Sequence, residues 1–302
     1  MKRDLSALKY EVTEDKKKRV IVDTDAACEA DDPFAIAHAL LSKKLEVKAI
    51  LAEQFGGPET TARSYEEIMT ILEAMDMEVP VFMGEEGSLA MTAGKEASPA
   101  VNFIIEEALR EDSKPLFVLC QGAITNVAAA IRKEPAIIPR MTVVWIGCHN
   151  LDGGEPPFRE FNSGNDIEAA NIVLGSGVEL WLIPSNVYGS MHIGLAEIQR
   201  RVYPCGKIGK HLFEYMVAYN QSEGAGWTAG ESWSLGDSPA VGVVLEPNCG
   251  SSVWREAPIM NEDTSCRFEP GRPMIKVYTS INSRFILEDF MCKLELVYGK
   301  EQ

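Results

Sequence analysis

The sequence has no uninterrupted apolar run that approaches the length needed to cross a bilayer. Residues 1–12 alternate charged and apolar side chains, where a signal peptide would have a continuous apolar segment. The seven cysteines are scattered, with no Cys-x-x-Cys pair and no spacing typical of a zinc finger. We therefore expect a soluble, cytoplasmic protein with reduced thiols and no membrane partner.

Basic residues are scarce as well. Lys and Arg total 29 against 45 Asp and Glu, which gives a formal net charge of −16 at pH 7. Because such a field repels phosphate backbones and anionic lipids, the sequence predicts no nucleic-acid partner. The composition, 46% hydrophobic and 25% charged, is otherwise ordinary for a globular protein. No linker rich in Pro, Gly or Ser marks a boundary, so we expect residues 1–302 to form a single domain.

Short β-branched runs alternate with amphipathic stretches along the chain, which predicts βαβ units. The predicted strands are 19–22, 47–51, 79–82, 116–119, 143–146, 180–183 and 274–278. The predicted helices are 34–42, 61–74, 101–110, 125–133, 167–174, 195–220 with a break near Pro204, and 284–292. This order favours an α/β fold in which helices flank a mostly parallel central sheet.

Polar residues follow directly after several of the predicted strands. Asp23 and Asp25 follow the first strand, Glu53 and Gln54 the second, and segments 121–126 and 147–150 follow two others. In open α/β sheets, ligands bind outside the carboxyl ends of the strands. We therefore expect these groups to converge on one site.

The strongest local signal is a cluster of five acidic residues within the ten positions that begin at Asp23. Carboxylates packed this closely repel one another unless a cation neutralises them, and Ca²⁺ or Mg²⁺ prefers such oxygen ligands. Helix capping is the alternative for Asp31 and Asp32, because Pro33 follows them. Capping does not explain Asp23 and Asp25 at the end of a buried strand.

The acidic cluster and three later segments together resemble the nucleoside hydrolases, which cleave the N-glycosidic bond of ribonucleosides. Their first motif reads Asp-x-Asp-Pro-Gly-x-Asp-Asp. Here both Asp pairs match, but five residues separate Asp25 from Asp31 where the family has three, and Pro-Gly is absent. The later matching segments are Gln-Gly-Ala-Ile-Thr-Asn (121–126), Trp-Ile-Gly (145–147) with Glu-Phe-Asn (160–162) and Asp-Ile-Glu-Ala-Ala (166–170), and Leu-Gly-Asp-Ser-Pro-Ala (235–240). The resemblance covers roughly residues 19 to 245 and implies a divergent member with a Rossmann-like core.

The resemblance implies a tightly held Ca²⁺ and a small-molecule nucleoside substrate. It makes Asp25 both a metal ligand and the catalytic base. The further metal ligands that it implies are Asp32, Asp237 and the main-chain oxygen of Thr125. The implied sugar contacts are Asp31 at the ribose 2′-hydroxyl, and Asn162 and Glu160 at the 3′ and 5′ sides. The family is commonly oligomeric, so the resemblance also implies a homo-oligomer.

Each match, taken singly, has a plainer structural interpretation. Thr125 can simply begin a helix, and Asp166 can cap another. Ser238 before Pro239 can cap a third. Their joint placement after strand ends, in the order of the family, favours the functional interpretation for Asp25, Asp32, Thr125 and Asp237.

The leaving-group side departs from the family. Many members have a histidine just before the late aspartate as a general acid, and this chain has Gly236 there. Trp227 and Trp233 lie in a glycine-rich stretch, and we predict that Trp233 contacts the base, although packing is an equal alternative. His149 follows a strand end near the site, but a structural role is the better interpretation of a lone histidine.

Two other classes compete with a hydrolase. A haloacid dehalogenase-type phosphohydrolase also begins with a strand that ends in Asp-x-Asp, with the nucleophile at the position of Asp23. That class expects Gly-Thr next, whereas Ala26 and Ala27 follow here. A non-catalytic nucleoside- or sugar-binding protein of the same fold is the second alternative, because Gly236 removes the usual acid and a fold alone does not guarantee chemistry.

Overall fold

A computed structural model describes residues 4–149, 151 and 158–299. Its centre is an eight-stranded sheet in the order β3-β2-β1-β4-β5-β6-β12-β9. All neighbours pair in parallel except β9, which runs antiparallel to β12 at one edge. The strands are β1 (Lys18–Thr24), β2 (Leu45–Ala52), β3 (Val81–Met83), β4 (Leu116–Cys120), β5 (Met141–Ile146), β6 (Glu179–Ile183), β9 (Gly250–Glu256) and β12 (Met274–Ile281).

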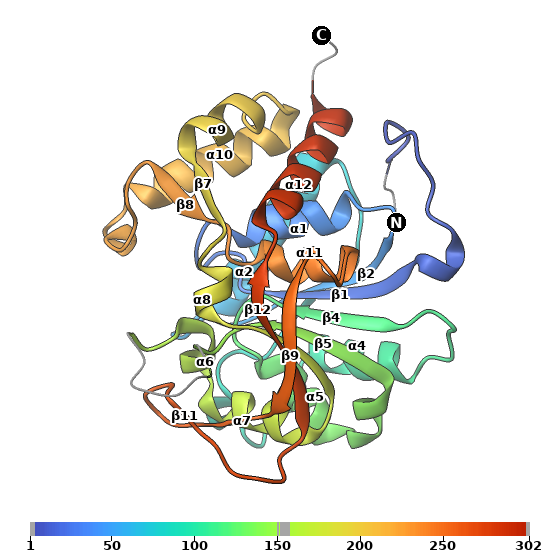
Figure 1. Ribbon diagram of the computed structural model, residues 1–302, viewed down its shortest axis with the longest axis vertical. Coiled ribbons are helices and arrows are strands. Elements are labelled where there is room, and N and C mark those ends of the chain that lie inside the picture. The colour runs from blue at the N-terminus through green and yellow to red at the C-terminus, as the bar shows by residue number, and fades with distance from the viewer. Residues whose placement is uncertain (1–3, 150, 152–157, 300–302) are drawn as a thin grey trace.

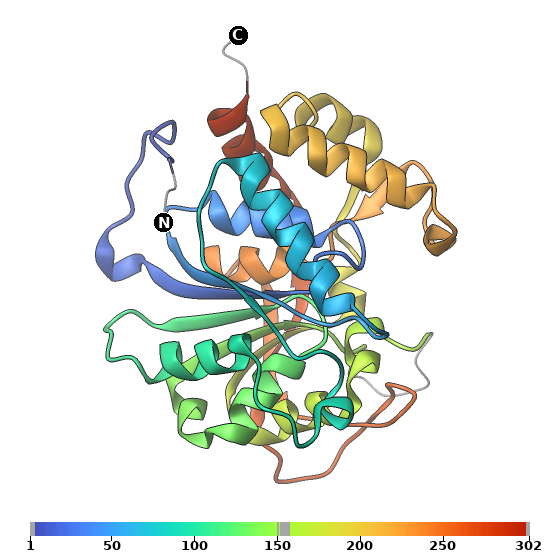
Figure 2. The ribbon, with the colours of Figure 1, turned by 180° about the vertical axis from the view of Figure 1, so that it is seen from behind.

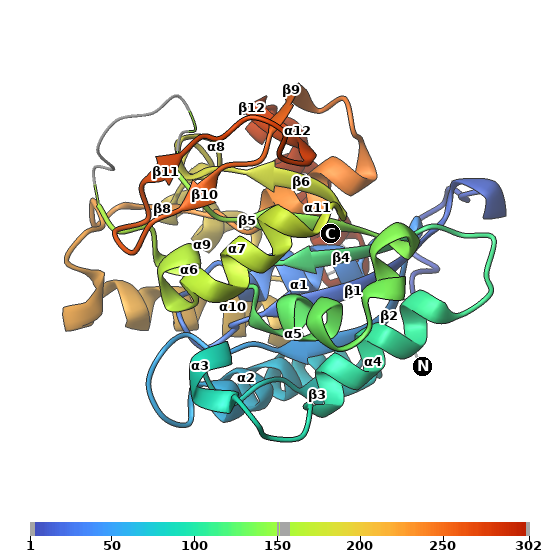
Figure 3. The same ribbon diagram turned by 90° about the horizontal axis from the view of Figure 1, so that it is seen from below.

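Helices cover both faces of this sheet (Figure 1). One layer contains α1 (Asp32–Leu40), α2 (Thr60–Met75), α10 (Gly206–Asn220), α11 (Ser238–Leu245) and α12 (Ser283–Tyr298). The other contains α4 (Pro99–Leu109), α5 (Thr125–Lys133) and α7 (Ile167–Ser176). In Figure 2, which shows the molecule from behind, α2 lies in front of the strands. In Figure 3, α5 and α7 lie in front of the strands.

Alternation along the buried strands builds the two cores. In β1, Val20 and Val22 pack in the core on the side of α1, whereas Ile21 packs in the core on the side of α5. Successive side chains of a strand point to opposite faces, so a run that is apolar at every position is buried on both. This pattern confirms the predicted single-domain α/β fold with a mostly parallel sheet.

Short helices, 3₁₀ turns and strand pairs make up the rest of the described secondary structure. They are the helices α3 (Leu89–Thr92), α6 (Phe161–Asn165), α8 (Ser185–Tyr188) and α9 (Leu195–Arg201), and the 3₁₀ turns Glu14–Lys16, Pro135–Arg140 and Glu223–Ala225. Two antiparallel strand pairs complete them: β7 (His192–Gly194) with β8 (Ser232–Ser234), which α9 and α10 separate in the chain, and the hairpin of β10 (Ile259–Met260) with β11 (Cys266–Arg267). In the described part of the chain, no helix is both long and apolar enough to cross a membrane.

The predicted elements exist, with differences at their ends. The predicted helix 195–220 is interrupted near Pro204, since α9 ends at Arg201 and α10 begins at Gly206. The last helix continues to Tyr298, six residues beyond its predicted end. The sequence patterns missed β9, because most of its side chains are exposed and it has no apolar run to mark it.

Candidate active site

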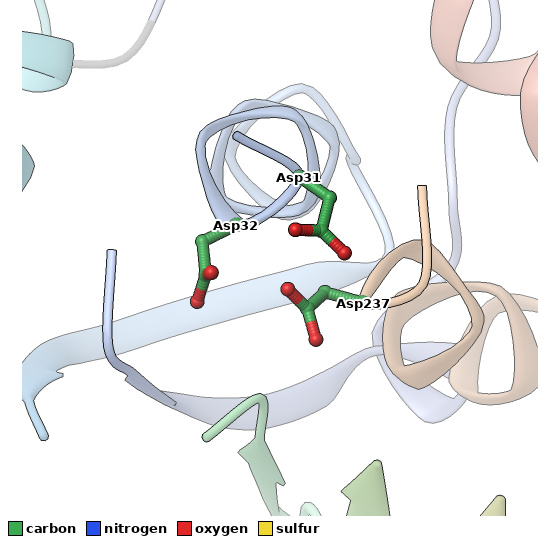
Figure 4. A group of neighbouring side chains, drawn as sticks. All are labelled: Asp31, Asp32 and Asp237. Carbon is green, nitrogen blue, oxygen red and sulfur yellow. The ribbon is translucent and has the colours of Figure 1, made fainter. Parts of the chain in front are cut away.

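Two helix N-termini bring three aspartates together at the carboxyl end of the sheet (Figure 4). Asp31 and Asp32 lie at the start of α1, and Asp237 directly precedes α11. One carboxylate oxygen from each lies within 4.8 Å of the other two, and all three residues are buried. The structure therefore places Asp31 in the same cluster as Asp32 and Asp237, although the resemblance assigned it to the sugar.

Capping does not account for this cluster. Asp31 is the N-cap of α1 and Asp237 the N-cap of α11, but neither side chain makes a capping hydrogen bond. Asp166 behaves differently, because its Oδ1 accepts from the amide of Ala169, 3.0 Å away, and caps α7. The plainer interpretation thus holds for Asp166, whereas side-chain capping explains neither Asp31 nor Asp237.

Asp25 lies beside the cluster, one residue beyond the end of β1. It is 2% exposed, and its Oδ2 has no hydrogen-bond partner in the structure. Its carboxylate lies directly against Gly122, where a Cβ atom would come within 2.6 Å of Asp25 Cγ. The glycine after β4 is therefore required for Asp25 to occupy this position.

Ionisation of the clustered carboxyl groups is unfavourable in this buried site. Burial raises the pKa of Asp25, Asp31 and Asp237 well above the ordinary value, and the charges of neighbouring carboxylates add to the rise. Burial also raises the pKa of Asp32 to about 6, and burial together with Asp32 raises that of Glu29 to about 7. Such groups ionise together near neutral pH when a cation compensates them.

The donor set fits a hard divalent cation. The converging atoms of Asp31, Asp32 and Asp237 are carboxylate oxygens. Asp25 lines the same pocket and adds a buried Oδ2 that has no hydrogen-bond partner. Oxygen ligands of this kind are those that Ca²⁺ and Mg²⁺ take in proteins. None of the described residues that line the surrounding pocket is Lys, Arg or His, so no basic side chain among them neutralises the carboxylates.

The carboxylates face a pocket of about 400 Å³, part of which is open to solvent. The described residues that line it are Asp25, Cys28, Glu29, Asp31, Asp32, Gln121, Ile146, Glu160, Phe161, Asn162, Tyr188, Gly236 and Asp237.

Thr125 begins α5 but does not line this pocket. Its hydroxyl donates to Asp166 Oδ2 at 3.1 Å and accepts from Gln54 Nε2 at 3.1 Å. The next amide, that of Asn126, donates to Glu53 Oε2 at 3.0 Å. These contacts fix the N-terminus of α5, and the metal contact of the Thr125 main-chain oxygen stays a prediction.

Glu160 is wholly buried and its carboxylate is occupied by protein donors. Tyr188 Oη donates to its Oε1 at 3.0 Å, and the amides of Cys148 and Ser163 donate to its Oε2 at 3.0 and 2.9 Å. Asn162 Nδ2 in turn donates to the Ile146 carbonyl at 2.9 Å. Both residues line the pocket, and these contacts give each a positioning role besides the predicted sugar contact, which is untested.

The predicted aromatic and histidine candidates lie outside the described pocket lining. Trp233 is 1% exposed and packs edge-on against Tyr219 and Trp227, with ring centroids 5.5 and 5.2 Å away. His149 is hydrogen-bonded to Ser185 Oγ and to the Phe158 carbonyl. Its contacts match the structural role expected of it.

Sequence reasoning missed several pocket residues. Tyr188 lies on α8, directly after β6, so the rule that sites follow strand ends signals it. Cys28 and Glu29 belong to the longer spacer between Asp25 and Asp31. Glu29 is part of the acidic cluster, but no separate role was predicted for it, and Cys28 has no signal in the pattern of charges. Tyr188 also explains Gly236, because a Cβ there would come within 3.2 Å of the Tyr188 ring.

Comparison with known proteins identifies the family. The family model for the inosine-uridine preferring nucleoside hydrolases matches residues 20–285. The chain belongs to this nucleoside hydrolase family. Membership supports N-ribosyl hydrolase activity and decides against the phosphohydrolase alternative, which expects a different motif after Asp25.

Individual relatives are similar over nearly their whole length. The nucleoside hydrolase described here is 28% identical over 284 residues to a pyrimidine-specific ribonucleoside hydrolase RihA of Salmonella paratyphi A, with 86% of this chain and 88% of the relative covered. A plant nucleoside hydrolase has the same fold, with a TM-score of 0.76, 18% identity, and 92% and 98% of the two chains covered. A purine-preferring ribonucleoside hydrolase of Gardnerella vaginalis gives a TM-score of 0.74 at 21% identity, with 94% and 100% covered.

Proposed function

We propose that this nucleoside hydrolase cleaves the N-glycosidic bond of a ribonucleoside with water, and that it does so with Ca²⁺. The observation that carries the proposal is a group of buried carboxylates at a pocket whose described lining contains no Lys, Arg or His. Asp25, Asp32, Asp237 and the main-chain oxygen of Thr125 would hold the ion. When bound, Ca²⁺ supplies positive charge that keeps these carboxylates ionised, and it offers coordination to oxygen atoms of the substrate.

Asp25 is the proposed general base. Its Oδ2 makes no hydrogen bond within the protein, so this atom is free to accept a proton from water. The water oxygen forms a bond to the anomeric carbon, and the bond from that carbon to the base nitrogen breaks with its electron pair on the nitrogen. The departing base then takes a proton from solvent, so the products are ribose and the free base.

The carboxylates have a second task during bond cleavage. The sugar becomes oxocarbenium-like and gains positive charge at the anomeric carbon. Fixed negative groups around the pocket stabilise that charge more than they stabilise the neutral substrate. Asp31 is the proposed acceptor for the ribose 2′-hydroxyl, with Asn162 and Glu160 proposed at the 3′ and 5′ sides.

The base lies on a side of the pocket without a histidine acid, because position 236 is glycine. Phe161 lines the pocket and is 45% exposed, and we propose that its ring packs against the base. The named relatives act on different bases, one pyrimidine-specific and one purine-preferring. The base is therefore to be identified with a panel of purine, pyrimidine and nicotinamide ribosides.

Release of free ribose from this panel tests the proposal. Asp25→Asn keeps the size of the side chain and removes the base, so we expect turnover to fall at least about a hundredfold. Asp263→Asn is the matched control, because Asp263 is exposed and lies outside the pocket lining. Tight, metal-dependent riboside binding without turnover in the wild type would identify the non-catalytic binding protein instead.

Assembly and compartment follow as lesser proposals. We propose a homo-oligomer, and the exposed Val253 and Trp254 on the edge strand β9 are consistent with a buried contact between copies. Light scattering of the purified protein tests this proposal, and a monomer at micromolar concentration contradicts it. We place the enzyme in the cytoplasm because none of its seven cysteines forms a disulfide, and cell fractionation checks that placement.

A further inference from the structure

Gln121 lines the pocket with a side chain that makes no hydrogen bond. Its backbone is fixed just beyond β4, where the amide donates to the Asp23 carbonyl at 2.8 Å and the carbonyl accepts from Asn162 Nδ2 at 3.5 Å. The residue is 1% exposed, and neither Nε2 nor Oε1 of its carboxamide has a partner. The pocket that Asp25 lines thus contains a buried donor, Nε2, and a buried acceptor, Oε1, that make no hydrogen bond to the protein.

This arrangement is costly in a protein with no ligand. More than about nine in ten buried polar groups in native structures are hydrogen-bonded, and an exception calls for an explanation. The second buried glutamine at a strand end shows the usual condition. Gln54 Nε2 donates to Thr125 Oγ1 at 3.1 Å, and its Oε1 accepts from the Gly56 amide at 2.7 Å.

The chemistry of the pocket indicates what Gln121 contacts. Ionised carboxylates accept hydrogen bonds but do not donate them, and a sugar hydroxyl both donates and accepts. Among the described lining residues, the Asn162 amide donates to backbone carbonyls and the Tyr188 hydroxyl donates to Glu160. Of the side-chain amides and hydroxyls in that lining, Gln121 Nε2 is the donor that the protein leaves uncommitted.

We propose that Gln121 is a substrate-binding residue whose Nε2 donates to the oxygen of one ribose hydroxyl, while its Oε1 accepts from the same or the adjacent hydroxyl. The inference rests on the proposed function, because it takes the ligand to be a ribosyl compound. It adds a neutral, donating contact to a sugar site that otherwise consists of acceptors.

The test compares Gln121→Met with the wild type on a riboside and on its 2′-, 3′- and 5′-deoxy analogues. Methionine is close in shape to glutamine and removes both polar atoms. Loss of a hydrogen bond of ordinary strength raises KM, or weakens riboside binding measured by calorimetry, roughly five- to tenfold. The deficit disappears on one analogue if Gln121 contacts a single hydroxyl, and it shrinks on two analogues if it contacts two adjacent ones.

Two further readouts separate binding from a structural role. We expect the ligand-free Gln121→Met variant to melt at the wild-type temperature or above it, because it no longer buries unpartnered polar atoms. We also expect an unchanged affinity for Ca²⁺. Gln121→Leu is a second variant with the same expectations, and Gln199→Leu is the control on an exposed glutamine.

Each opposite result overturns the inference. An equal deficit on all four substrates, a lower melting temperature, or a tenfold loss of Ca²⁺ affinity would show a general, structural or metal-ligand role for Gln121. A wild-type enzyme without turnover contradicts the proposed function alone, and riboside calorimetry then still tests Gln121. Absence of any riboside binding by the metal-loaded wild type overturns both.

Discussion

Replacement of Gly122 by alanine tests whether the position of Asp25 is set by the packing of the loop after β4. The new Cβ would lie 2.6 Å from Asp25 Cγ and 2.9 Å from each carboxylate oxygen. Ordinary non-bonded contacts between carbon atoms are about 3.5–4.0 Å, so the two groups must separate by about 1 Å. Asp25 is buried on the other sides, and either it or the loop has to move.

The consequence should be larger for catalysis than for folding. Overpacking a buried site costs about 1–3 kcal/mol of stability. A displacement of about 1 Å in a catalytic group costs about a hundredfold in rate. We therefore expect Gly122→Ala to fold, to lose about 1–3 kcal/mol in urea denaturation, and to release ribose about a hundredfold more slowly than the wild type.

Gly194→Ala is the matched control for this prediction. A Cβ at Gly194 meets no atom within 4 Å, and the residue has an ordinary φ of −78°. Alanine there should leave activity unchanged and stability equal or slightly higher. Wild-type activity in Gly122→Ala would refute the reasoning, because it would mean that Asp25 does not need its observed position.

Three further predictions follow from the same structure. Chelation should lower the melting temperature of the wild type, since an ion present at a hundredfold its dissociation constant contributes about 2.7 kcal/mol, and unchanged melting by calorimetry would contradict a structural contribution of the ion. Gly236→Ala should weaken riboside binding several-fold in calorimetry, because its Cβ would lie 3.2 Å from both Asp31 Oδ2 and the Tyr188 ring, and unaltered binding would show that these groups yield easily. Burial raises the pKa of Asp289, but the hydrogen bonds and charges of His38 and Lys293 together outweigh burial and lower it to about 2. Because that folded value is below the ordinary 3.8, the stabilisation is fully present above about pH 4 and is lost as the pH falls toward 2. Asp289→Asn should therefore cost about 1–2 kcal/mol at pH 7 and flatten this acid dependence, as urea denaturation at several pH values would show.

The sheet and its helices could be predicted because burial imposes regular patterns. Strand β4 is apolar at every position and β5 at every position except Thr142, and both are followed by amphipathic helices. The pairing of β9 with β12 could not be predicted in this way. An exposed edge strand has no buried face, so its sequence carries no alternation of apolar and polar residues.

The candidate site was predictable where chemistry follows a strand end. Asp25 and Asp32 were found from the crowding of charge after the first strand, and Asp237 from its resemblance to a late motif. The structure brings Asp237 to Asp31 and Asp32 because α11 packs against α1 in the same helical layer. Local sequence does not reveal what else contacts a side chain. For this reason the donors around Glu160 were not foreseen, and packing and a contact with the base stayed equal alternatives for Trp233.

Gln121 also shows that sequence does not reveal the contacts of a side chain. Its position after β4 predicts a place near the site, but only the three-dimensional contacts show that its carboxamide lacks partners. Gln54 also follows a strand and is also buried, yet it is fully bonded to Thr125 and Gly56. Sequence thus predicts which residues approach the site better than it predicts which of them remain available to a ligand.

The most direct test of the account is the release of free ribose by the purified wild-type enzyme before chelation, after chelation, and after Ca²⁺ is restored. The account predicts turnover that disappears when the metal is removed, returns with Ca²⁺, and does not return in Asp25→Asn. Undiminished turnover of the chelated enzyme, or full activity of the Asp25→Asn variant, would contradict it.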